Sequence, residues 1–207
     1  NGTPVLSVAD PTILLRGNNL GRLGDFAGAE ALYERSAHGP RLETRFPPVG
    51  TAARGFCWHH ALLADAIVPS GDTARLRALA DTLAVGCAKS FFGRDRRLHH
   101  HVRGLLAMLQ GRWFDAEAEL QQARWGVAES WTRTNVALAK TELALNEPRA
   151  ALAALRDAYA SPLDGMGRYQ PRSELDLLMA HAFRQAGDAD SALVYEAYVR
   201  RAWHNAD

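Results

Sequence analysis

The spacing of hydrophobic positions predicts a helical chain. Apolar residues recur at helical spacing over most of its length, and no segment alternates polar and apolar residues as a half-buried strand would. Alanine, leucine and arginine are abundant, and all three favour helices. The expected helices cover residues 52–67, 72–88, 95–110, 113–125, 130–145, 148–159, 173–186 and 189–204.

One pattern recurs along the chain: a helix, a short turn, and a second helix that carries alanine and a large apolar residue. The clearest copies are residues 14–37 and 100–123. Residues 143–158 and 183–199 repeat the turn and the second helix, and residues 64–83 form a weaker copy. A single helix pair cannot bury its own apolar face, so we expect stacked pairs that share one core.

Each copy has Gly or Asn at the turn, the residues that tolerate a left-handed backbone after a helix. A small residue follows on the second helix, where it would let a neighbouring helix approach closely. The turn residues are Gly24, Gly71, Gly111, Asn146 and Gly187, and the small residues are Ala29, Ala116, Ala151 and Ala192.

The segments "GDFAGAEALYERSA" (24–37), "GRWFDAEAELQQA" (111–123), "NEPRAALAALRDA" (146–158) and "GDADSALVYEAYV" (187–199) resemble the tetratricopeptide repeat. The copy at Gly71 departs from it, because Thr73 replaces the aromatic residue and Leu76 the alanine. The turns also lie 35–47 residues apart, whereas the family repeats at about 34. The resemblance implies an all-α fold, a right-handed α-solenoid of about five helical hairpins, from residue 12 onward.

The expected organisation is an extended lead-in over residues 1–11 and a single superhelical domain over 12–207. Proline and glycine mark two long loops, at 38–50 and 161–173. The chain lacks an initiator Met, which suggests a fragment of a longer bacterial protein.

Composition and charge restrict the classes of partner and the cellular location that we expect. The net charge of +1 argues against a general nucleic-acid binder, and no apolar run approaches the roughly 18 residues of a membrane helix. The only cysteines, Cys57 and Cys87, are too few for a disulfide framework and lack zinc spacing, so we expect reduced, buried thiols. These features favour the cytoplasm.

Histidines are the main candidates for metal-binding or catalytic residues in the sequence. His99, His100 and His101 project about 100° apart on a helix, so they cannot all reach one metal ion. A zinc site combining Cys57, His59 and either His99 or His101 is conceivable, but histidines four residues apart with a carboxylate are absent. No nucleophile elbow, phosphate loop or dinucleotide motif is present. We expect no enzyme activity, metal or cofactor.

The predicted function is that of a non-catalytic scaffold. The resemblance implies a concave groove that binds a peptide, a partner protein, or another domain of the parent chain. By register, the groove-lining residues are Asn18, Arg22, Trp58, Asp65, His101, Leu105, Met108, Arg133, Lys140, Leu177, His181 and Arg184.

Two alternatives belong to other classes. The first is a regulatory or sensory region of a larger bacterial transcription regulator, signalling enzyme or hydrolase. The second is a metal-dependent enzyme built on His59, His60 and His99–His101.

Overall fold

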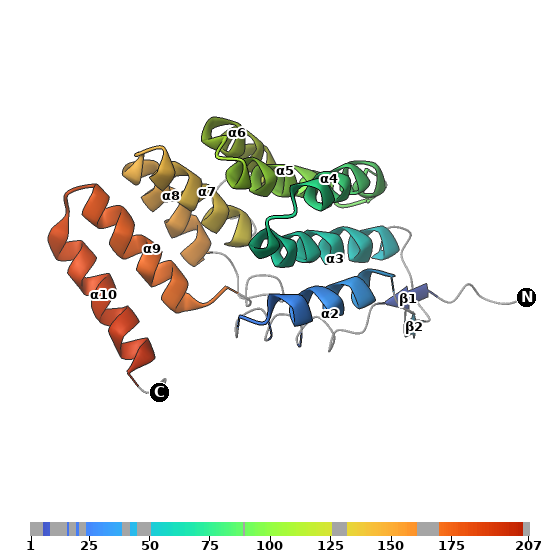
Figure 1. Ribbon diagram of the computed structural model, residues 1–207, viewed down its shortest axis with the longest axis horizontal. Coiled ribbons are helices and arrows are strands. Elements are labelled where there is room, and N and C mark those ends of the chain that lie inside the picture. Colours follow the sequence, from blue (N-terminus) through green and yellow to red (C-terminus); the bar gives the residue numbers. More distant parts are fainter. Residues whose placement is uncertain are drawn as a thin grey trace, which may run out of the picture. The chain divides into compact units, whose positions relative to one another are not determined.

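The computed structural model is mainly helical (Figure 1). It describes residues 6–8, 16, 20, 24–38, 42–44, 51–88, 90–125, 132–160 and 170–204. The helical class is confirmed for this part of the chain. In it, no helix has the length and apolar character needed to cross a bilayer.

Contacts divide the chain into two compact units, Asn1–Gln110 and Gly111–Asp207. The expectation of one domain over residues 12–207 stays a prediction. The first unit contains β1 (Leu6–Val8), α2 (Phe26–His38), β2 (Leu42–Thr44), α3 (Thr51–Ile67), α4 (Thr73–Cys87) and α5 (Leu98–Leu109), with one-turn 3-10 helices η1 (Val68–Ser70) and η2 (Asp95–Arg97).

The two strands were not expected. β1 and β2 form an antiparallel ribbon in which Leu6 lies opposite Thr44 and Val8 opposite Leu42. They fall in the segments predicted as an extended lead-in and a long loop. At three residues each, they are too short to show an alternating pattern in the sequence.

The second unit contains five helices among the described residues. They are α6 (Trp113–Ala123), α7 (Thr132–Ala144), α8 (Pro148–Ala160), α9 (Arg172–Gln185) and α10 (Ala189–Trp203). In both units each helix packs against the next along the chain, and contacts also join α3 to α5 and α7 to α9.

The five predicted turn positions all have a left-handed backbone. The φ angle is +62° at Asn146 and between +68° and +82° at the four glycines. After three of these turns, an amide N–H bonds the carbonyl five residues earlier, as from Asp188 to Phe183 at 2.9 Å. This 6→1 bond satisfies a carbonyl that the ending helix leaves unpaired. The Gly-or-Asn signal therefore located the five turns correctly.

A buried side chain follows each turn by five residues. Four of these residues are the predicted alanines, each at most 1% exposed, and the fifth is Leu76, which is fully buried. The amide of each bonds the carbonyl of the residue just after the turn, and Asp72 and Asp188 also cap α4 and α10 through their carboxylates. The same local structure thus recurs five times. The four alanines are Ala29, Ala116, Ala151 and Ala192.

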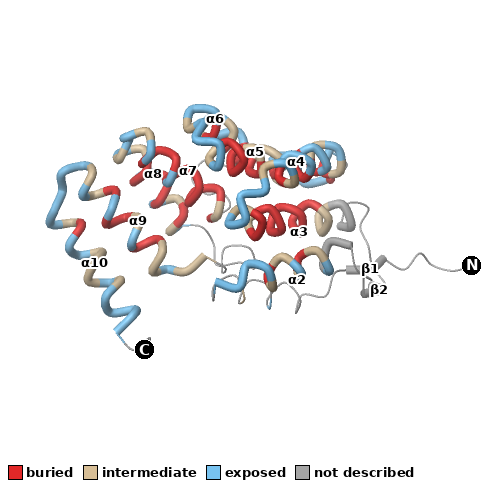
Figure 2. The backbone as a smooth tube through the Cα atoms, viewed as in Figure 1, coloured by how far each residue is buried: buried red, intermediate tan, exposed pale blue. Residues whose placement is uncertain are grey.

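Two helices are buried around most of their circumference (Figure 2). Every residue from Cys57 to Ala64 on α3 is buried, and so is every residue from Thr134 to Ala139 on α7. A helix on the surface buries one stripe only. Because α3 packs against α2, α4 and α5, and α7 against α6, α8 and α9, each is the central helix of its unit.

The turn conformation gives a stability test. We expect Gly111→Val to lower the free energy of unfolding by more than about 1 kcal/mol, since a β-branched residue is strained at φ +68°. A Cβ at this position meets no atom within 4 Å, so the cost is conformational and not a clash. Gly93→Ala is the control, because Gly93 also has open space but no left-handed φ. Equal urea midpoints for the two variants would contradict the prediction.

Candidate functional site

The first unit contains a buried polar network around Asp95. The carboxylate of Asp95, which is fully buried, accepts hydrogen bonds from the Trp58 indole (2.9 Å) and the Ser90 hydroxyl (2.7 Å). Ser90 in turn accepts from the Phe92 amide and, at its carbonyl, from the Arg96 guanidinium. These bonds hold the segment between α4 and α5 against α3. No sequence pattern indicates them, since Asp95 lies within an arginine-rich run that resembles a solvated loop.

The histidines are mostly packed into the helical framework. The His101 ring is fully buried, with its Nε2 3.3 Å from Asp65 Oδ1, and His60 Nδ1 lies 2.7 Å from the Phe56 carbonyl oxygen. His99 Nδ1 lies 2.8 Å from the Arg96 carbonyl oxygen. Bonds of this kind are typical of histidines that stabilise a fold. Throughout the described ranges, no three His, Cys, Asp or Glu side chains are placed to hold a metal ion.

Cys57 and Cys87 form a disulfide, so the prediction of reduced thiols is wrong. Their Cα atoms are 5.7 Å apart, and the bond joins α3 to the last residue of α4. Neither residue is exposed. The two cysteines are separated by 30 residues in sequence, and only the packing of the two helices brings them together. The disulfide also takes the thiolate away from the conceived zinc site.

The groove residues predicted in the first unit are mainly interior. Trp58, His101 and Leu105 are 3%, 0% and 7% exposed, which contradicts the expectation that they face a ligand. Asp65 and Met108 are partly buried. The register placed these residues on a free face, but α3 and α5 are covered on several sides. Asn18 and Arg22 lie outside the described residues.

The groove residues predicted in the second unit lie at the surface or close to it. Leu177, His181 and Arg184 are exposed and follow one another along one stripe of α9. Glu174, on the same stripe, accepts a bond from the exposed Lys140 of α7 at 2.7 Å. We call Lys140, Glu174, Leu177, His181 and Arg184 the α7/α9 surface. Arg133, also predicted, is partly buried on α7.

Helix α7 also carries polar groups that are buried without partners. Asn135 is fully buried, and neither its amide oxygen nor its amide nitrogen has a hydrogen-bond partner in the described part of the chain. The same holds for Oε2 of Glu142, which is 3% exposed and lies two turns further along the same face. Burial raises the pKa of Glu142 to about 7; Glu117 and Glu147 add to the rise, and Arg124 opposes it.

Glu142 predicts a pH-dependent stability. Its pKa is higher in the folded chain than in the unfolded one, so between about pH 4.5 and 7 the folded state binds more protons. Stability from this group is therefore fully present below pH 4.5 and is lost as the pH rises through 7. We expect a loss on the order of 2–3 kcal/mol between pH 5 and 8, which Glu142→Gln should abolish. Parallel curves of unfolding free energy against pH for the two proteins would contradict this.

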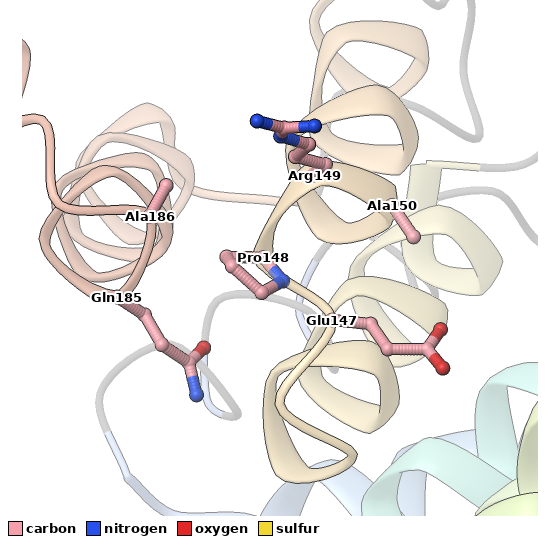
Figure 3. A pocket seen from close by; sticks show the side chains of 6 residues that line it. All are labelled: Glu147, Pro148, Arg149, Ala150, Gln185 and Ala186. Atoms are coloured by element: carbon pink, nitrogen blue, oxygen red, sulfur yellow. The ribbon is translucent and has the colours of Figure 1, made fainter.

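An open hollow of about 490 Å³ lies between the start of α8 and the end of α9. Figure 3 shows Pro148 facing the end of α9, and Glu147 pointing away from it. The Gln185 amide donates to the Leu143 carbonyl (3.1 Å) and to Asn146 Oδ1 (2.9 Å), which ties α9 to the preceding turn. Among the described residues of the lining, only Glu147 and Arg149 ionise, and both are exposed.

No family model, curated protein or solved structure matches the chain.

Proposed function

We propose that the chain is a non-catalytic helical-repeat scaffold that binds a segment of another protein on the α7/α9 surface. The observation that carries this proposal is the exposed row of Leu177, His181 and Arg184 on α9. The row puts the apolar side chain of Leu177, 56% exposed, beside the imidazole of His181 and the guanidinium of Arg184, whose Nε donates to Glu196 of α10 at 2.7 Å. Such a mixture suits a partner segment with an apolar side chain next to acidic ones.

A solenoid arrangement fits the same proposal. The recurring turn, the buried small residue after it, and the packing of each helix on the next are the features expected of stacked helical hairpins. In such a stack the first helices of successive hairpins line one surface. In the second unit those helices would be α7 and α9, which contact each other directly.

The test is a selection of peptides followed by measured affinities. A library of random peptides displayed on phage would be panned on the 207-residue chain, and the enriched sequences would be titrated against variants. We expect enrichment of an apolar residue flanked by Asp or Glu, and affinities at least about tenfold lower for Leu177→Asp and for Lys140→Glu.

Phe114→Asp is the matched control, because Phe114 is 75% exposed on α6 and does not belong to the α7/α9 surface. It should bind the selected peptides as the unmodified chain does. A library without enriched sequences, or peptides that bind all four proteins equally, would refute the proposal.

The disulfide bears on the compartment in which the scaffold works. Cytosolic glutathione and thioredoxin keep most thiols reduced, whereas disulfides persist in oxidising compartments. Since Cys57 is bonded to Cys87, we propose an oxidising compartment in place of the cytoplasm expected from the sequence. Alkylation of the protein in intact source cells, read by mass spectrometry, would support this if neither cysteine is labelled after denaturation.

A further inference from the structure

Among the described residues, helix α10 packs against α9 through one face. Ala192 is fully buried, and Tyr195 stacks on Phe183 of α9 with 5.6 Å between ring centroids. Glu196 and Val199, on the same side, are partly buried. This inner face accounts for the contact of α10 with α9, and it leaves the opposite side of the helix outward.

The outer face of α10 is apolar in the middle and charged at both ends. Its central side chains are large and exposed: Leu193 is 51%, Val194 49% and Tyr198 44% exposed. An aspartate precedes them and an arginine follows. In chain order the residues of the outer face are Asp190, Leu193, Val194, Ala197, Tyr198 and Arg201, at intervals of three, one, three, one and three.

These intervals read the same in both directions. The spacing i, i+3, i+4, i+7, i+8, i+11 is that of one helix stripe packed on another. If a second copy of α10 lies antiparallel against the first, about a two-fold axis through the middle of the stripe, opposite members meet. Leu193 then faces Tyr198 of the copy, and Val194 faces Ala197.

The same antiparallel register also brings oppositely charged side chains of the two copies together. Asp190 of each copy meets Arg201 of the other, so two ion pairs flank the apolar centre. Both residues are exposed in the described structure, at the ends of α10 where their charges also suit the helix dipole. Self-complementary shape and charge on one patch are what an interface with two-fold symmetry requires.

We propose that the outer face of α10 is a homodimer interface, in which two copies of the chain pair their α10 helices antiparallel. Pairing removes the exposed apolar centre from contact with water. An apolar patch of this kind, left exposed, favours non-specific aggregation. The interface lies on α10 and is separate from the α7/α9 surface. The proposal therefore does not depend on the proposed peptide binding.

The first experiment is sedimentation equilibrium of the 207-residue chain. We expect a reversible dimer with a dissociation constant on the order of 10–100 µM, as suits a small interface. Leu193→Asp should abolish it, whereas Phe114→Asp, a matched change at a site on α6, should leave it unchanged. A chain that is monomeric up to about 500 µM, or a dimer that survives Leu193→Asp, overturns the proposal.

The second experiment tests the antiparallel register through charge. Asp190→Arg alone and Arg201→Asp alone each set like charges opposite one another at both ends, so each should raise the dissociation constant about tenfold. An equal mixture of the two variants restores both ion pairs in a heterodimer, which should form as readily as the unmodified dimer. If mixing brings no recovery, the antiparallel register is refuted; if neither variant weakens the dimer, the charge pairing is refuted.

Discussion

Replacing Trp58 with alanine is expected to lower the free energy of unfolding by about 3–5 kcal/mol. The indole is 3% exposed on α3, so its removal leaves a cavity in the core of the first unit. The change also takes one of two donors from the buried Asp95 carboxylate. A buried acceptor that loses its donor adds about 1–3 kcal/mol within the total. Urea unfolding followed by circular dichroism measures the effect.

Two further variants separate the contributions. Trp58→Phe fills most of the volume but cannot donate to Asp95, so its cost should be intermediate. Trp203→Ala, at a residue 62% exposed on α10, should change stability by no more than about 0.5 kcal/mol. Should Trp58→Ala prove no more costly than Trp203→Ala, the Trp58 side chain does not belong to the core.

Loss of the disulfide is the other large expected effect. Replacing both Cys57 and Cys87 with alanine should lower the free energy of unfolding by about 3–4 kcal/mol, given the 30-residue separation that the bond closes. The reason is mainly that the open chain gains conformational entropy when it unfolds. Urea titrations of the oxidised protein and of the double variant give the difference directly.

A reducing agent supplies the control. It should lower the stability of the unmodified protein when added to the unfolded chain before refolding, and it should leave the double variant unchanged. Before any reduction, a thiol reagent should find no free cysteine in the denatured protein. Two reactive thiols at that point would mean that the bond does not form in solution.

Local signals made the helices and their ends predictable. Gly or Asn ends a helix because its backbone reaches positive φ at little cost, and this rule found all five turns. The buried positions just after the turns followed from the same alignment, and even the departing copy buries Leu76 in the place of alanine. Such features depend on a few neighbouring residues, which a sequence shows directly.

Contacts between distant segments were not predictable in this way. Asp95 is an acid amid arginines, and nothing near it in sequence reveals that Trp58, 37 residues earlier, donates to it. The disulfide likewise depends on how α3 lies against α4. The unpartnered amide of Asn135 gives no sequence signal either, because asparagine is usual on an exposed helix face.

The groove assignment failed in the first unit for a related reason. Helical register tells which residues share a face, but it does not tell how many faces other helices cover. Trp58 and His101 share faces with residues that could line a groove, yet α3 and α5 bury them. On α9, by contrast, the residues that helical register assigned to the groove are exposed: Leu177, His181 and Arg184.

Because α3 is enclosed by its neighbours, it is also expected to be among the last helices to open. Its amides from Cys57 to Ala64 lie in a helix that is buried all round, cross-linked to α4 and bonded to the segment before α5. Hydrogen exchange at those amides needs disruption of the whole unit, since fraying of a neighbour does not release them. In the monomer, α10 is held mainly through its contact with α9, so it can detach from α9 while α7 and α8 stay folded. A protease acting on the native protein would therefore reach α10 long before it reached α3.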